Sequence, residues 1–316
     1  MLATPMPMHI PDGFLSVIVS LALWVISVIM ISVALKRVNI DLEDRQIPLM
    51  GILGAAVFAG QMLNFSVTGG TSGHLLGAAI ATILLGPWPA ILVMTCVVGV
   101  QAIVFQDGGL LALGANLFNM AIVGVTVAYF VQRLIQKPAG NRPWVTVVSG
   151  FASGWLSILI ASLACGLELA LSGTSPANIA IPAMAGIHAL IGIGEGLITA
   201  GALAFVASAR SDLLTLETTP TPASRSLWVV GLALAVLLAV ISPVASAHPD
   251  GLEWVAEQQG FLDRAQAPLY DLMPDYLLPG ISNEALATVL AGIAGVGLVL
   301  LATVGVAMGR RRSSAA

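Results

Sequence analysis

The chain has 316 residues, of which 58% are hydrophobic and only 9% are charged, with a formal net charge of −4. Soluble domains usually carry about 25% charged residues, so this composition indicates a protein whose solvent is a lipid bilayer. The small net charge gives no reason to expect a nucleic-acid partner.

Apolar runs long enough to cross a bilayer recur along the chain. A spanning helix needs roughly 20 apolar residues. The runs of suitable length are 14–35, 46–63, 88–105, 110–132, 145–172, 183–208, 227–246 and 284–308. The shorter run 74–86 is expected to be a tilted or partly buried helix that also crosses, since backbone at membrane depth needs hydrogen-bond partners inside the protein. The sequence therefore predicts an all-α integral membrane protein with residue 1 outside and the C-terminus in the cytoplasm.

The basic residues support this topology. Of the 12 lysines and arginines, all but Arg264 fall in predicted inner segments, as the positive-inside rule requires. Without 74–86 as a crossing, Arg133 and its neighbours would move outside. The charges therefore favour counting 74–86 as a crossing in the cell or plasma membrane.

A polar, proline-rich stretch divides the chain and reads as a linker. The expected parts are an N-terminal extension 1–7, a seven-helix core 8–208, a cytoplasmic linker 209–226, a two-span part 227–309 with an outer loop 247–283, and a basic cytoplasmic tail 310–316. A signal-peptidase site after Ala247 is the alternative to an uncleaved span. Cys96 and Cys165 lie in apolar runs and are expected to pack there, not to form a disulfide or zinc site. Small residues in the second span favour either packing within the chain or docking of a partner helix (Gly51, Gly54, Ala55 and Gly60).

Two histidines are the main candidates for chemistry. His9 lies just outside the first span, and His74 follows the glycine-rich stretch 69–73 at the outer start of the third. Imidazole suits nickel, copper, zinc and iron, and a square-planar nitrogen set selects nickel or copper. If Met8 were the first residue, its amine, the His9 amide and the His9 ring would chelate one metal ion in two small, nearly unstrained rings, and His74 would supply the fourth nitrogen. The alternative is that each histidine is structural and hydrogen-bonded.

Three segments in order carry a resemblance to a known family. Residues 8–16, beginning Met8-His9-Ile10-Pro11-Asp12-Gly13, the stretch 62–77 around His74, and 188–196 resemble the CbiM/NikM family, over about residues 8–208. Members are substrate-capture membrane subunits of energy-coupling-factor (ECF) ABC importers for cobalt, as used in cobalamin biosynthesis, or nickel. Residues 249–253 resemble the PDGLE (NikN-like) part that some members carry at the C-terminus.

The resemblance implies a metal site, partners and no enzymatic activity. The family's metal ligands fall on Met8, His9 and His74, and the transported ligand would be Ni²⁺ or Co²⁺, with no prosthetic group. The implied partners are a CbiQ/NikQ-like transmembrane scaffold and CbiO/NikO-like ATPases. The chain departs from the family because residues 1–7 precede Met8. We therefore expect the working protein to begin at Met8.

Other polar residues have secondary roles in this interpretation. Asn64, Ser72 and Asp12 are candidates to orient a ligand. His188 and Glu195, seven positions apart on one helix face, are interpreted as a buried pair that orients the core, with a second metal site as the alternative. His248 is expected to be exposed.

Two competing functions have less support. An intramembrane zinc protease would need HExxH, which is absent, and no GxxxxGK[ST] loop for ATP hydrolysis occurs either. An autonomous carrier or channel is the other alternative, although Glu168, Glu195 and His188 are the main ionisable groups in the spans. The sequence does not decide between nickel and cobalt, and the fused C-terminal part favours nickel by analogy.

Overall fold

The fold comes from a computed structural model that describes residues 9–38, 46–140, 142–209, 213–214 and 225–314. The N-terminal extension, Met8 and most of the linker lie outside the described residues. The longer helices are α1 Val17–Arg37, α2 Gln46–Gln61, α4 Pro87–Val104, α6 Gly124–Ala139, α7 Pro143–Leu171, α8 Ala177–Ala209, α9 Arg225–Ile241 and α11 Glu284–Ser314. Shorter elements are β1 Phe65–Val67, β2 Thr71–Gly73, α3 Ala78–Leu85, α5 Leu113–Leu117, the π-helical η1 Phe118–Val123, η3 Ser242–Val244, α10 Gly251–Gln259, η4 Leu262–Arg264 and η5 Pro274–Tyr276.

The predicted all-α membrane fold is confirmed. Among the described residues, six helical stretches are long and apolar enough to cross a membrane, and 46–61 and 228–244 form shorter apolar helices. The only sheet in this part of the chain is the antiparallel β1–β2 hairpin. The protein is therefore a multi-pass membrane protein.

The short predicted span 74–86 is helical only over α3, which is buried. Its helical part, α3, has eight residues, and nearly all are buried. At about 1.5 Å per residue α3 is about 12 Å long, well short of a hydrocarbon core of about 30 Å. The preceding residues 74–77 are not helical, so their backbone groups need partners inside the protein.

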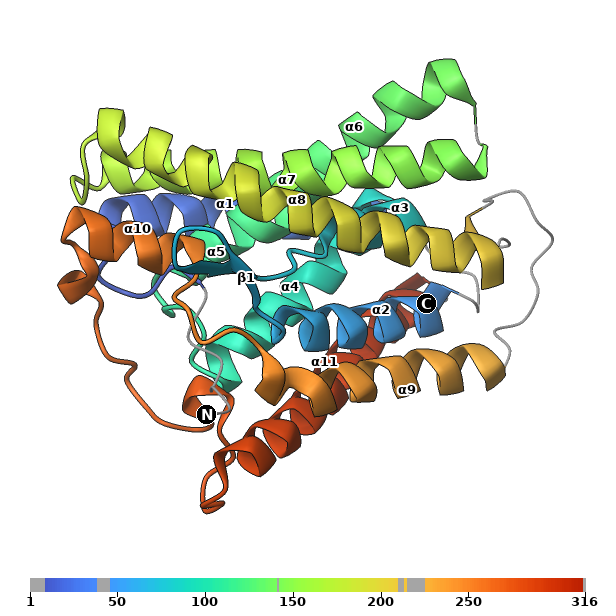
Figure 1. The fold of residues 1–316 in the computed structure, drawn as a ribbon. Helices are drawn as coiled ribbons and strands as arrows, with labels where there is room; N and C mark the ends of the chain where they lie inside the picture. The colour runs from blue at the N-terminus through green and yellow to red at the C-terminus, as the bar shows by residue number, and fades with distance from the viewer. Residues whose placement is uncertain (1–8, 39–45, 141, 210–212, 215–224, 315–316) are drawn as a thin grey trace.

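The C-terminal helices pack directly against the N-terminal core. In Figure 1, α7 and α8 run side by side on one face, and α2, α9 and α11 lie together on the other. A Cβ at Gly51 would lie 2.7 Å from Val304 Cγ2, and one at Gly54 would lie 2.9 Å from Thr303 Oγ1. The small residues of α2 therefore allow close approach of α11, which is the intramolecular interpretation of their spacing.

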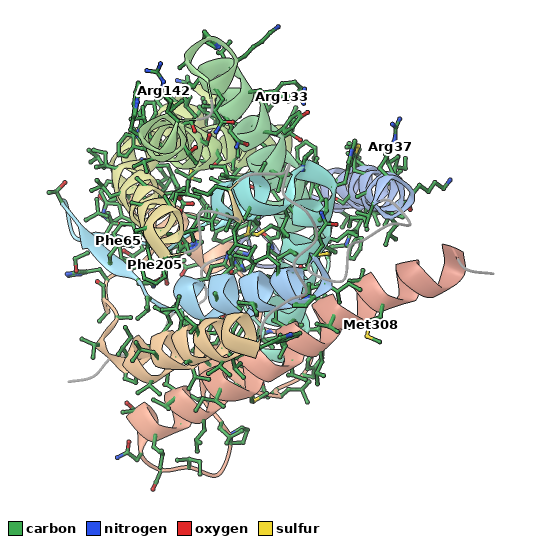
Figure 2. All side chains as sticks on the ribbon, turned by 90° about the vertical axis from the view of Figure 1, so that its right-hand side faces the viewer. Arg37, Phe65, Arg133, Arg142, Phe205 and Met308 are labelled. Atoms are coloured by element: carbon green, nitrogen blue, oxygen red, sulfur yellow. The ribbon has the colours of Figure 1, made fainter. Side chains whose placement is uncertain are left out.

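The two ends of the bundle differ in character. One end carries basic residues, and Figure 2 looks onto it, with Arg37, Arg133 and Arg142 around its edge. The opposite end carries the hairpin and α10, on the left of Figure 1. The candidate site lies at this second end.

Candidate metal centre

The N-terminal segment that carries His9 is held by hydrogen bonds to its backbone. The Ile10 N–H donates to Asn116 Oδ1 at 3.0 Å, and Asn116 Nδ2 donates back to the Ile10 carbonyl at 3.1 Å. The Gly109 N–H donates to the same carbonyl at 2.9 Å. This irregular segment is thereby held beside α5 with the Ile10 backbone groups paired.

Asp107 contacts both the backbone and the ring of His9. The His9 N–H donates to Asp107 Oδ1 at 3.2 Å, and His9 Nδ1 lies 3.2 Å from the Asp107 carbonyl oxygen. The Tyr276 hydroxyl donates to Asp107 Oδ2 at 2.5 Å, and its ring stacks on Phe105. Tyr276 belongs to the C-terminal outer loop, so the Asp107 carboxylate links this loop to His9.

His74 is positioned by the hairpin and by α8. Gly73 has no Cβ to clash with Ile191, whose Cγ2 would lie only 2.3 Å from it. Glu195 on α8 accepts hydrogen bonds from the backbone N–H groups of Leu76 at 2.6 Å and Gly77 at 3.1 Å. One buried carboxylate therefore satisfies the non-helical backbone that follows His74.

The structure brings the two candidate histidines together. The ring centroids of His9 and His74 lie 5.7 Å apart, with an interplanar angle of 84°. Both rings line a cavity of about 80 Å³ that also borders His188, Cys165 and Asp250. His9 Nε2 is buried and has no hydrogen-bond partner among the described residues.

The His74 ring is suited to donate a lone pair. Burial, and next the neighbouring His9, lower the pKa of His74 to about 4, so the ring is neutral near neutral pH. Its Nδ1 lies 3.0 Å from the Leu75 carbonyl oxygen. Within the described part of the chain, no group of three His, Cys, Asp or Glu side chains is arranged to hold a metal ion.

The three residues suggested to orient a ligand do not bond either ring. Asn64 is buried, and its backbone carbonyl accepts a hydrogen bond from the Ser246 N–H at 2.8 Å. Ser72 Oγ donates to the His248 carbonyl at 2.8 Å, which ties β2 to the C-terminal outer segment. Asp12 Oδ1 accepts from Ala112 N–H at 2.9 Å. In the structure these contacts anchor loops and not the imidazole rings.

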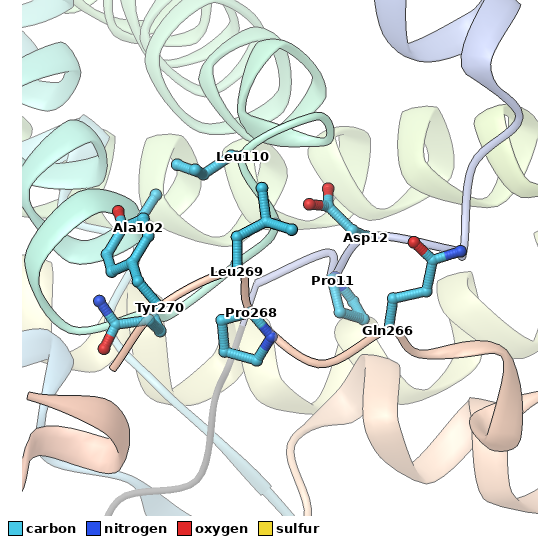
Figure 3. A pocket seen from close by; sticks show the side chains of 11 residues that line it. Pro11, Asp12, Ala102, Leu110, Gln266, Pro268, Leu269 and Tyr270 are labelled. Atoms are coloured by element: carbon cyan, nitrogen blue, oxygen red, sulfur yellow. The ribbon is translucent and has the colours of Figure 1, made fainter. Parts of the chain in front are cut away.

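The outer loop lies against the N-terminal segment. Figure 3 shows Pro11 and Asp12 beside Gln266 and Pro268 in one pocket. The Gln266 N–H donates to the Asp12 carbonyl at 2.8 Å. The C-terminal part of the chain therefore covers the segment that carries His9.

His188 and Glu195 have separate roles. His188 Nδ1 lies 2.8 Å from the Met184 carbonyl oxygen, and the ring borders the cavity, while Glu195 holds the loop before α3. His248 is exposed, as expected. The sequence interpretation missed Asp107, Asn116, Asp250 and Tyr276. Asp107 and Asn116 stand out only as isolated polar residues between apolar runs, and this signal does not reveal their partners.

Known proteins resemble both parts of this chain. Residues 9–213 match the sequence model of CbiM, described as a cobalt uptake substrate-specific transmembrane region, and residues 225–312 match the PDGLE domain. The fused nickel transport protein NikMN of Rhodobacter capsulatus is 32% identical, covering 96% of this chain and 98% of its own. The cobalt transport protein CbiM of Sorangium cellulosum is 35% identical, covering 53% of this chain and 76% of its own. A crystal structure of a truncated transition metal transporter matches with a TM-score of 0.57 and 35% identity, covering 64% of this chain and 99% of that one.

Proposed function

This chain belongs to the CbiM family, and on that premise we propose that it captures a Ni²⁺ or Co²⁺ ion on the extracytoplasmic face for an ECF-type importer. It is a nickel/cobalt transport membrane protein, and its named relatives are transport proteins, not enzymes. The single observation that carries the proposed site is the approach of the His9 and His74 rings to 5.7 Å, with both rings lining the same cavity.

The proposed ligands are Met8, His9 and His74. A Met8 amine, the His9 amide nitrogen and a His9 ring nitrogen would hold the ion from one side, and His74 from the other. Nitrogen ligands of this kind suit nickel, and cobalt less strongly. His9 N and Nδ1 face Asp107 in this structure, so ion binding would exchange those contacts for metal bonds.

The proposed orientation follows from the basic end of the bundle. Arg37, Arg133 and Arg142 gather at the end opposite the site (Figure 2). Cytoplasmic segments carry the excess of lysine and arginine in membrane proteins. The site end would therefore face outward, with the C-terminus in the cytoplasm.

The proposed partners would supply the energy for transport and for release of the ion into the cytoplasm. The chain has no GxxxxGK[ST] phosphate loop, so this route to ATP hydrolysis would lie on separate ATPase subunits. A CbiQ/NikQ-like scaffold would couple them to this subunit.

Metal binding to a chain that begins at Met8 tests the site. We expect His9→Ala and His74→Ala each to weaken Ni²⁺ and Co²⁺ binding by at least about 100-fold, since the loss of a group that only orients a metal ligand already costs about 10- to 100-fold. His248→Ala is the control, because His248 is exposed and does not border the cavity. Unchanged affinity in both site variants would refute the assignment. Uptake by this chain without ATPases would instead identify an autonomous carrier.

A further inference from the structure

A second, larger cavity lies beneath the C-terminal outer loop, next to the proposed metal site. Its volume is about 390 Å³. The N-terminal segment forms one wall with His9, and the outer loop contributes Asp250, Glu253, Asp271 and Asp275. None of the lining residues is a lysine or arginine. The part of the lining that the outer loop contributes therefore carries four carboxyl groups and no basic side chain.

This cavity adjoins the histidine cavity through shared residues. His9, Asp250 and Leu252 border both. The His9 side chain is 2% exposed, and its Nε2 has no hydrogen-bond partner in the described part of the chain. A buried, unpartnered nitrogen that faces an acid-lined space is an observation independent of the carboxylates, and it points to a cation as the ligand.

The carboxylates are distributed along a path from solvent inward. Asp271 and Asp275 are exposed, Glu253 is partly buried, and Asp250 is buried at the N-cap of α10, where it accepts from Glu253 N–H at 2.7 Å. Clefts lined by one sign of charge concentrate counter-ions and raise association rates by about 10- to 1,000-fold. An exposed acidic mouth leading to a nitrogen ligand is therefore arranged to speed entry of a cation.

We propose that this cavity is the entry vestibule for the transported divalent cation, and that Asp271 and Asp275 draw the ion toward His9. The C-terminal part of the chain would then act on the rate of capture, not on the ligand set. This inference rests on the proposed function and names the route to that same site.

Rapid-mixing kinetics with Ni²⁺ on the chain that begins at Met8, in lipid nanodiscs, test the vestibule. We expect the double variant Asp271→Asn with Asp275→Asn to slow association about 3- to 10-fold at low salt, with an unchanged dissociation rate. The deficit should shrink as salt rises, because screening shortens the reach of exposed charges. Asp271→Lys should slow association further.

A matched control removes two other outer charges. Asp263 and Glu284 are exposed in the same outer region and do not line the cavity. Asp263→Asn with Glu284→Gln should leave association unchanged. Equal slowing in both double variants, or none in either, would overturn the vestibule. Either result leaves the His74→Ala binding loss intact, whereas failure of the metal site would appear as normal equilibrium binding by His74→Ala.

Discussion

Replacement of Asn116 by leucine isolates the contribution of loop anchoring to metal capture. Asn116 is 3% exposed and makes two hydrogen bonds with the Ile10 backbone, at 3.0 and 3.1 Å. Leucine has a similar size and can replace neither bond. The residue itself is not a proposed ligand, so any loss of affinity would come from the segment that holds His9.

The magnitude follows from the partners that remain. The Ile10 carbonyl keeps its bond from Gly109 N–H at 2.9 Å, so only the buried Ile10 N–H loses its partner. A lost hydrogen bond contributes about 1 kcal/mol and an unpaired buried group costs about 1–3 kcal/mol, which gives a total of about 2–4 kcal/mol. At about 1.4 kcal/mol per tenfold, Asn116→Leu should weaken Ni²⁺ binding by roughly 30- to 700-fold.

Equilibrium titration with Ni²⁺ in nanodiscs measures this loss. Ser27→Ala is the control, because it removes a buried hydrogen bond to the Gly114 carbonyl at 2.7 Å without touching the His9 segment. Its Ni²⁺ affinity should be normal. If the Ni²⁺ affinity of Asn116→Leu lies within about threefold of that of the unmodified chain, a difference of under about 1 kcal/mol, then anchoring of this segment does not limit capture.

Two further changes probe the supports of the site. Glu195→Gln leaves one acceptor oxygen where two serve the loop before α3. It should lower the thermal unfolding midpoint and weaken Ni²⁺ binding by about tenfold, because a charge-assisted hydrogen bond contributes about 1.5–3 kcal/mol. An unchanged midpoint would contradict this role. Tyr276→Phe keeps the ring on Phe105 but removes the hydroxyl from Asp107. Because ion binding would exchange the His9–Asp107 contacts for metal bonds, loosening Asp107 should favour the metal-bound state and tighten Ni²⁺ binding by up to about fivefold, at about 1 kcal/mol per bond. Unchanged affinity would mean that the outer loop does not act through Asp107.

The lengths of the apolar runs predicted most of the helices. Whether a segment of about 20 residues can cross a bilayer depends on its own residues, so it can be read from the local sequence. The run 110–132 corresponds to the continuous helical stretch α5 to α6, and 284–308 lies within α11. The run 74–86 was harder to interpret. Its residues are apolar enough to be helical throughout, but residues 74–77 are not helical, and Glu195, more than 100 positions away, binds the backbone of Leu76 and Gly77.

The candidate histidines were also found from sequence, because His9 and His74 lie within motifs that resemble one family. The distance between the two rings could not be predicted from sequence, since it depends on packing between segments far apart in the chain. Asp107, Asn116 and Tyr276 became relevant only when the segments that carry them met the His9 segment at one end of the bundle. Composition and local pattern thus determined that the chain crosses a membrane and where its helices run. Tertiary structure decided which buried polar groups face one another, because each needs a partner that only long-range folding supplies.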